Sequence, residues 1–247
     1  MVELLLGKGA LISTRNRSES TPLHLAAWWG HTGMVELLLG KGALIEAGEG
    51  DDSTPLHLAA GKGHTDVVEL LLEKGALIEA RSRNGYTPLH RAVWNGYTGT
   101  VELFLRKGAL IEARNEDGNT PLHLAAQNGR TDIVELLLGK GASIEAVNND
   151  KYTPLHHAAS NGHTGTAELL LRKGASTKAV NREKYTPLHF AAWNGNTGVV
   201  GLLLGKGAST EAVSRHNETP LNLARRNGHI VELLENTAAR KQHTVLG

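Results

Sequence analysis

Two short apolar segments alternate along the chain, separated by glycine and polar residues. The first has the pattern Pro-Leu-His-Leu-Ala-Ala, as in residues 121–126, and the second the pattern Val-Glu-Leu-Leu-Leu, as in residues 134–138. Each predicts a helix shorter than the roughly 12–15 residues that an isolated helix needs in water. Each helical pair must therefore bury its leucines against the next pair, which predicts a stack whose stability is shared between neighbours.

The two segments recur with a fixed period. All seven prolines stand in the tripeptide Thr-Pro-Leu at a spacing of 33 residues, which is typical of a repeat protein. Threonine suits the N-cap of the first helix, and proline at the first helical position loses no useful N–H. A glycine, from Gly30 to Gly228, is predicted to end the first helix. The second helix is predicted to begin at an N-cap threonine such as Thr32 and to end at Lys41-Gly42.

The repeated unit has a recognisable sequence. Thr-Pro-Leu-His occurs six times and Thr-Pro-Leu-Asn once, and the Val-Glu-Leu-Leu-Leu and Lys-Gly-Ala patterns recur beside it. This unit resembles the ankyrin repeat over nearly the whole chain. The resemblance implies an all-α, ankyrin-repeat α-solenoid, elongated and curved, of helix-turn-helix pairs with short β-hairpin fingers. It also implies a concave binding face formed by the fingers and the ends of the first helices.

We interpret residues 1–247 as a single domain of repeats with a distinct unit at each end. Residues 1–15 match only the second helix and tail of a repeat, which favours a segment cut from a longer array and predicts weak self-association through uncovered apolar residues. Residues 214–247 are predicted to form a capping repeat, with a frayed or disordered tail from residue 238. Full repeats are predicted at 16–48, 49–81, 82–114, 115–147, 148–180 and 181–213.

Composition narrows the classes of function. The 26 basic and 25 acidic side chains give a net charge of +1, so no overall field attracts nucleic acid or an anionic membrane. The absence of cysteine excludes disulfides and thiolate chemistry and fits an intracellular, cytoplasmic location. No apolar run is long enough for a transmembrane helix.

The thirteen histidines do not indicate a metal site or a catalytic site. Six belong to the Thr-Pro-Leu-His motif, so adjacent copies are expected about 8–10 Å apart, too far to share one metal ion. The resemblance implies that these histidines are structural. The Gly-Lys-Gly strings lack the spacing of a phosphate loop and lie at helix C-termini. We therefore predict no enzyme activity, no cofactor and no metal.

The positions that differ between repeats carry the prediction of function. Three tryptophans stand seven residues after the motif threonine and Trp29 stands eight after it, and three of the four tyrosines immediately precede that threonine. Tryptophan, tyrosine and arginine dominate binding hot spots, and core positions are already filled by leucine and alanine. We predict that a partner protein binds at Arg17, Trp28, Trp29, Arg83, Tyr86, Arg91, Trp94, Tyr152, His157, Tyr185, Phe190 and Trp193.

Two other functions stay open at this point. Trp28 with Trp29, or Tyr86 with Trp94 and Arg91, could stack on a nucleotide or another small ligand. Alternatively, the near-identical repeats permit an engineered scaffold without a natural partner. The mixed charges of the fingers favour a protein partner over nucleic acid, which would favour a continuous basic stripe.

Overall fold

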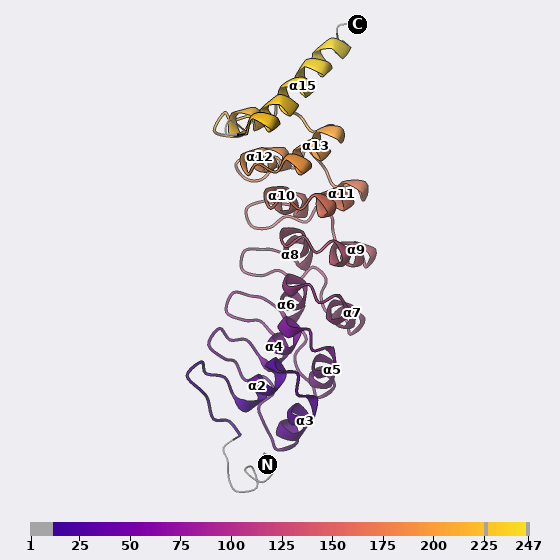
Figure 1. Cartoon of the computed structure of the whole chain (residues 1–247). Helices are drawn as coiled ribbons and strands as arrows, with labels where there is room; N and C mark the ends of the chain where they lie inside the picture. Colours follow the sequence, from indigo (N-terminus) through magenta and orange to yellow (C-terminus); the bar gives the residue numbers. More distant parts are fainter. Residues whose placement is uncertain (1–11, 225–226, 246–247) are drawn as a thin grey trace. The chain divides into compact units, whose positions relative to one another are not determined.

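The computed structural model describes residues 12–224 and 227–245, which form helices and loops without a β-strand. The predicted incomplete first repeat, and with it the predicted self-association, lies largely outside the described residues. The helices in chain order are α2 (Pro22–Trp28), α3 (Thr32–Gly40), α4 (Pro55–Lys62), α5 (Thr65–Glu73), α6 (Pro88–Asn95), α7 (Thr98–Arg106), α8 (Pro121–Gln127), α9 (Thr131–Gly139), α10 (Pro154–Ser160), α11 (Thr164–Arg172), α12 (Pro187–Trp193), α13 (Thr197–Gly205), α14 (Pro220–Leu223) and α15 (Gly228–Val245) (Figure 1). The predicted all-α fold of helical pairs is confirmed.

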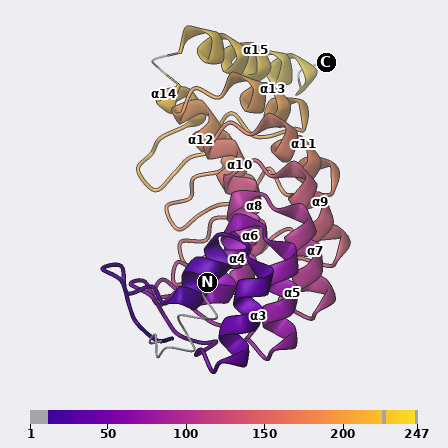
Figure 2. The same cartoon turned by 60° about the horizontal axis from the view of Figure 1, so that its bottom comes forward.

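The chain divides into two units, an N-terminal unit ending at Glu116 and a C-terminal unit starting at Asp117. In the N-terminal unit α2, α4 and α6 contact one another in order and form one layer, and α3, α5 and α7 form a second layer (Figure 2). In the C-terminal unit α8, α10, α12 and α14 form the first layer and α9, α11, α13 and α15 the second. The loops between repeats, called fingers below, project on the side of the first helices (Figure 1).

The core lies between the two layers of each unit. Leu56 and Ala60 of α4 and Val68 and Leu71 of α5 are each at most 1% exposed, and the same positions are buried in the other five pairs from α2 and α3 to α12 and α13. Burying one such leucine or valine contributes about 1.5–3 kcal/mol. The small alanine side chains of the first helices, such as Ala60, allow the first helices of neighbouring repeats to pack closely.

Each first helix begins with a reciprocal cap between threonine and the residue three positions later. Thr21 has an extended backbone, the Thr21 N–H donates to Nδ1 of His24 at 3.1 Å, and the His24 N–H donates to Oγ1 of Thr21 at 3.4 Å. In the last repeat, the Thr219 N–H donates to Oδ1 of Asn222 at 2.9 Å. Asparagine thus replaces histidine there without loss of the cap.

The capping histidine also joins its repeat to the next one. Because Nδ1 accepts from a backbone N–H, the proton of the neutral ring is on Nε2, which donates to the finger carbonyl 29 residues later. His24 donates to Ser53 at 3.1 Å and His57 to Tyr86 at 2.9 Å. The same bond is made by His123 to Tyr152, His156 to Tyr185 and His189 to Glu218. The predicted structural role of these histidines is confirmed.

The second helices begin at threonine, but threonine is not their N-cap. The cap is the preceding residue, such as His31 or His64, and its side chain makes no capping hydrogen bond. The threonine hydroxyls instead link neighbouring second helices: Oγ1 of Thr65 lies 2.8 Å from Oγ1 of Thr100, and Thr131 and Thr166 form an equal pair. The predicted N-cap is therefore wrong by one residue.

The residue before the threonine of a second helix can hydrogen-bond to the end of the first helix in the preceding repeat. Nε2 of His64 lies 2.9 Å from the Trp28 carbonyl, and Nε2 of His163 lies 2.9 Å from the Gln127 carbonyl. The neighbouring glycine makes room for this side chain: a Cβ on Gly129 would lie 2.6 Å from Nδ1 of His163. Gly129 also has a φ of 66°, as predicted for a glycine that ends a helix.

A glutamate in each of several fingers forms another link between repeats. Oε1 of Glu46 accepts from the Leu77 N–H at 2.8 Å, and Oε1 of Glu79 accepts from the Leu110 N–H at 2.7 Å. Glu145 accepts from the Ser176 N–H in the same way at 2.7 Å. Lysine occupies this position in the next repeat, as Lys178, and an ammonium group cannot accept a hydrogen bond.

The C-terminal end differs from the sequence-based expectation. Gly228 does not end a helix but begins α15, which continues to Val245, so the described part of the tail is helical rather than disordered. The preceding helix α14 is short and has Ala224 as its C-cap. The long last helix α15 packs against α13 and α14.

The fingers keep one turn geometry despite different residues at their tips. Asn16 and Ser20 close the first finger by a backbone hydrogen bond of 3.1 Å, and no β-strand is assigned to the fingers in the described residues, so the predicted β-hairpins are turns only. Neighbouring tips are joined by backbone bonds such as Arg83 N–H to Asp51 at 2.7 Å. The tip residues Glu19, Asp52, Lys151, Lys184 and Asn217 have positive φ values of 58–63°, close to those of the tip glycines Gly85 and Gly118.

Because the non-glycine finger tips have left-handed backbones, replacing a tip residue by glycine should stabilise the folded chain. A left-handed conformation costs a side-chain-bearing residue about 1–2 kcal/mol, partly offset by the larger unfolded-state entropy of glycine. We expect Lys151→Gly and Lys184→Gly each to raise the free energy of unfolding by about 0.5–1 kcal/mol in urea titrations. Gly85→Ala is the reverse control, because its Cβ would lie 2.9 Å from the Glu116 nitrogen. Unchanged or lower stability of both lysine variants would contradict the strain.

The capping histidines predict a loss of stability in mild acid. Burial lowers the pKa of His57 and of His156 to about 4, from an ordinary value of 6.5. Because the unfolded chain binds protons first, this contribution is complete above about pH 6.5 and is lost as the pH falls towards 4. Lowering the pH from 7 to 5 should therefore reduce the free energy of unfolding by about 2 kcal/mol for each of these histidines.

The matched control uses the residue of the last repeat. His57→Asn and His156→Asn should retain the cap, as Asn222 does, and remove the titrating ring. Urea unfolding of the double variant should therefore vary less between pH 7 and pH 5 than that of the original chain. An equal pH dependence in both proteins would show that these rings do not carry it.

Candidate functional site

The four tryptophans all lie on the surface at the ends of first helices. Trp28 is the last residue of α2 and Trp29 its C-cap, Trp94 lies near the end of α6, and Trp193 ends α12. Their exposed fractions are 39%, 66%, 38% and 59%, respectively. The prediction that the indoles lie outside the core is confirmed.

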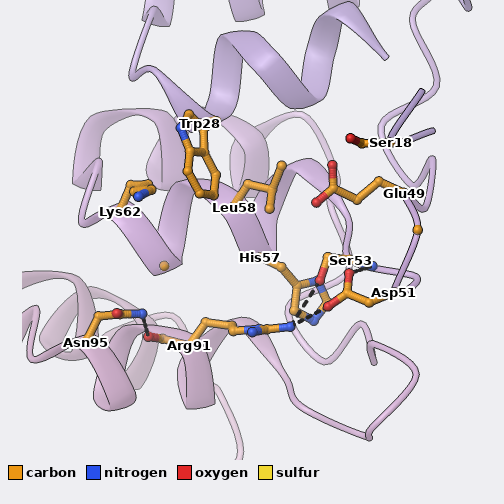
Figure 3. A pocket seen from close by; sticks show the side chains of 12 residues that line it. Ser18, Trp28, Glu49, Asp51, Ser53, His57, Leu58, Lys62, Arg91 and Asn95 are labelled. Atoms are coloured by element: carbon orange, nitrogen blue, oxygen red, sulfur yellow. Dashed lines mark hydrogen bonds and ion pairs between the residues drawn. The ribbon is translucent and has the colours of Figure 1, made fainter. Parts of the chain in front are cut away.

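The N-terminal unit has a pocket beside one of these tryptophans. It has a volume of about 500 Å³ and lies between the ends of α2, α4 and α6 and the finger before α4 (Figure 3). Its lining residues are Ser18, Trp28, Glu49, Gly50, Asp51, Ser53, His57, Leu58, Gly61, Lys62, Arg91 and Asn95. We call this the Gly61 pocket.

Arg91 is held along one wall of the Gly61 pocket. Its Nη2 lies 2.6 Å from Oδ2 of Asp51 and 3.4 Å from Oγ of Ser53, and its guanidinium lies 5.4 Å from the Tyr86 ring centroid. Partial burial would raise the pKa of Asp51, but hydrogen bonds from Ser53 and the charge of Arg91 hold it below its ordinary value. Asp51 is therefore ionised and fixes the guanidinium in place.

The other charged groups of the pocket also have contacts within the chain. Nζ of Lys62 lies 3.7 Å from the centroid of a Trp28 ring, a cation–π contact. The Ser20 hydroxyl donates to Oε2 of Glu49 at 2.5 Å. Figure 3 shows Lys62 beside Trp28, with Glu49 and Asp51 at the opposite side of the pocket.

Gly61 creates open space between these side chains. It stands at the helix position that holds Trp28 in the preceding repeat and Trp94 in the following one. A Cβ on Gly61 would lie 3.8 Å from the Arg91 Cβ, an ordinary contact. Packing therefore does not require glycine there, and the missing side chain leaves the pocket open.

The C-terminal unit contains a row of neighbouring aromatic rings. The Phe190 ring lies 5.2 Å from the Tyr152 ring and 5.7 Å from the Tyr185 ring. Tyr185 in turn lies 6.5 Å from Trp193 and 6.2 Å from His216, with which it is stacked. These rings form one aromatic cluster that extends over the fingers of three successive repeats.

Two members of this cluster are buried, contrary to the sequence-based expectation. Tyr185 is 9% exposed and Phe190 is 8% exposed, because Phe190 fills the space between two tyrosine rings. The Tyr185 hydroxyl donates to Oε2 of Glu218 at 2.5 Å, and this bond is the main reason that the pKa of Tyr185 is raised. Leucine occupies the Phe190 position in most repeats and is 44% exposed as Leu25 but buried as Leu124, so burial at this position depends on the neighbouring side chains.

His157 is neutral and partly buried in the same region. Its ring lies 5.6 Å from the His123 ring and 5.7 Å from the Tyr152 ring. Burial, reinforced by His123 and His156, lowers the pKa of His157 to about 3, and its buried Nε2 has no hydrogen-bond partner. The His157 ring is therefore uncharged.

The remaining predicted contact residues lie in the fingers. Arg17 and Arg83 are exposed, and Nε of Arg83 forms an open ion pair with Asp52 at 3.4 Å. Gly61 and Lys62 of the pocket are absent from the sequence-based prediction. Comparison of the seven copies at the tryptophan position reveals Gly61, whereas the contact of Lys62 with Trp28 needs the structure.

The described residues contain no cluster of histidine and acidic side chains suited to a metal ion. Within the same part of the chain, no helix has the length and hydropathy needed to cross a bilayer.

Comparisons with known proteins agree on one family. A model described as ankyrin repeats in three copies matches residues 43–115, 83–148, 100–181, 133–214 and 173–245, and a model of ankyrin repeats in many copies matches residues 1–39. The human ASB11 ankyrin repeat domain is 28% identical with a TM-score of 0.81, covering 88% of this chain and 98% of that one. The ankyrin repeat domain of Bcl-3, a member of the IkappaB protein family, is 33% identical with a TM-score of 0.73, covering 89% and 100%. No curated protein matches the chain.

Gly61 predicts a stabilising substitution at the pocket. Glycine in a helix interior costs about 0.5–1 kcal/mol relative to alanine, and the structure has room for the added methyl group. We expect Gly61→Ala to raise the free energy of unfolding by about 0.5–1 kcal/mol, measured by urea titration. Gly129→Ala should instead destabilise the chain, because of its positive φ and the close His163 ring. A loss of stability in Gly61→Ala would mean that the backbone there requires glycine.

Proposed function

Because the chain belongs to the ankyrin repeat family, whose domains are generally protein–protein interaction modules, we propose that it binds a partner protein through its fingers and first-helix ends. The chain acts in this proposal as a binding module, in keeping with a family whose domains are typically non-enzymatic. An intracellular, cytoplasmic location stays a prediction from the cysteine-free sequence.

The observation that carries the proposal is the exposure of all four tryptophans. Trp29 and Trp193 expose 66% and 59% of their surface, although smaller polar residues occupy the same helix end in other repeats. Large apolar side chains that are exposed at the same part of several repeats, here the end of the first helix, are typical of an interaction site. Indoles at such sites contribute large contact areas when a partner covers them.

The fixed geometry of the fingers supports the same proposal. Five fingers are tied to the preceding repeat by the histidine bond, and neighbouring tips are joined by backbone bonds such as Asn149 N–H to Asp117 at 2.9 Å. Side chains on a preordered surface lose less conformational entropy on binding. The fingers can therefore present Arg17, Arg83 and the neighbouring acids without a costly rearrangement.

The charges of the fingers favour a protein over nucleic acid. Arginines lie beside acidic residues in ion pairs such as Arg83 with Asp52 and Arg182 with Asp150, and His216 lies 3.5 Å from Glu183. Such a surface has alternating signs and presents no continuous basic stripe. A protein with its own mixture of charges is the complementary partner.

Stacking of a nucleotide, the other function open from the sequence, receives less support. The cation that stacks on Trp28 is the chain's own Lys62, and Arg91 already lies against Tyr86. The phosphates of a nucleotide would have to draw Lys62 or Arg91 away from these contacts. The protein-binding proposal needs no such displacement, since the exposed Trp29 and Trp193 rings make no comparable cation contact among those identified in the described residues.

The tryptophans predict the outcome of a binding comparison. We expect the triple variant Trp28→Ala, Trp94→Ala and Trp193→Ala to lose cellular partners at least tenfold in quantitative affinity purification, because partner contacts with the indoles are removed. The matched control replaces three exposed leucines outside the first-helix ends, Leu44, Leu77 and Leu110, which are 70%, 61% and 59% exposed. Both variants should keep a helical circular dichroism spectrum. Equal partner lists for the tryptophan variant and the original chain would refute the proposal.

A further inference from the structure

We infer that the Gly61 pocket receives one uncharged aromatic side chain of the partner protein, as an anchor. This inference rests on the proposed function and goes beyond it, because it gives the chemical class of a partner residue and the position that selects it. The pocket lies wholly within the N-terminal unit.

The open space over Gly61 is a feature of the surface and not a requirement of the fold. The glycine lies inside α4, its backbone is not left-handed, and a Cβ would make only ordinary contacts with Arg91 and Asn95. The preceding and following repeats fill this position with Trp28 and Trp94. A gap therefore interrupts a row of large side chains, at a point where a partner's side chain can enter.

The walls of the pocket suit a flat ring. Figure 3 shows Trp28 and Leu58 on one side and the long side chain of Arg91 along the other. Both indole and guanidinium groups stack on aromatic rings. The Arg91 guanidinium is held by Asp51 at 2.6 Å, so it offers a fixed planar surface and need not be ordered on binding.

The charges of the pocket argue against a charged occupant. Asp51 is paired with Arg91, the Lys62 ammonium lies on the Trp28 ring, and Glu49 accepts from the Ser20 hydroxyl. An entering cation or anion would lose water and find its counter-charges already engaged. An uncharged ring leaves these contacts intact and covers the Leu58 side chain. With about 500 Å³ available, the pocket can hold such a ring together with adjoining partner backbone.

The test is a selection with a random peptide library displayed on phage, using the full chain as target and the Gly61→Leu variant for counter-selection. We expect the retained peptides to share phenylalanine, tyrosine or tryptophan at one position. Peptides that share arginine, lysine or an acid there, or a library in which nothing prefers the original chain over Gly61→Leu, would overturn the inference.

Binding of a fluorescently labelled, selected peptide, followed by anisotropy, gives the quantitative comparison. Gly61→Leu should weaken binding at least tenfold by filling the pocket, while Gly61→Ala should change it less than threefold. Gln127→Leu, at the same helix position in the C-terminal unit, is the matched control and should also have less than a threefold effect. Replacing the peptide's aromatic residue by alanine should weaken binding at least tenfold. A Gly61→Leu variant that binds as tightly as the original chain would exclude the pocket.

The two proposals fail in different ways. If the triple tryptophan variant loses cellular partners while Gly61→Leu retains them and the selected peptides, the binding surface stands and the anchor pocket does not. If the tryptophan variant keeps all its partners, the proposed surface fails. Circular dichroism of each variant separates these results from unfolding.

Discussion

The neutral imidazole of the Thr-Pro-Leu-His motif is the contact on which the remaining structure depends. One nitrogen accepts from the backbone that starts a first helix, and the other donates to the finger of the next repeat. A single side chain thereby fixes both a helix end and the position of the neighbouring finger. Burial keeps it uncharged, and the neutral ring is the only form that can accept and donate at the same time.

The proposed binding surface depends on this scaffold. Once caps, finger positions and second-helix contacts are fixed by repeated residues, the tips and helix ends are free to vary without loss of the fold. The N-terminal and C-terminal units use this freedom differently. One leaves a gap at Gly61 beside paired charges, and the other fills its corresponding region with packed rings around Phe190.

The sequence predicts the parts of the fold that repeat and fails where a residue acts only through its neighbours. Periodicity and turn chemistry suffice for the helical pairs, the threonine caps of the first helices and the left-handed glycines, but they place the caps of the second helices one residue too late. The burial of Tyr185 and Phe190 could not be predicted, because it depends on rings from three repeats meeting in space. Likewise, Lys178 and Asn222 are single substitutions in the pattern. Their effects, a lost bond between repeats at Lys178 and a retained helix cap at Asn222, appear only when donors and acceptors are placed.

Lys178 has a consequence for how the array comes apart. The glutamate-to-backbone bond that Glu46, Glu79 and Glu145 make with the following repeat cannot be made from this position. Cohesion in a linear array is a sum over adjacent junctions, so the loss of this bond weakens the junction that it would have joined. The missing bond would have joined the repeat of α10 and α11 to the repeat of α12 and α13. Opening at this junction should therefore release α12 to α15 together while α8 to α11 stay folded.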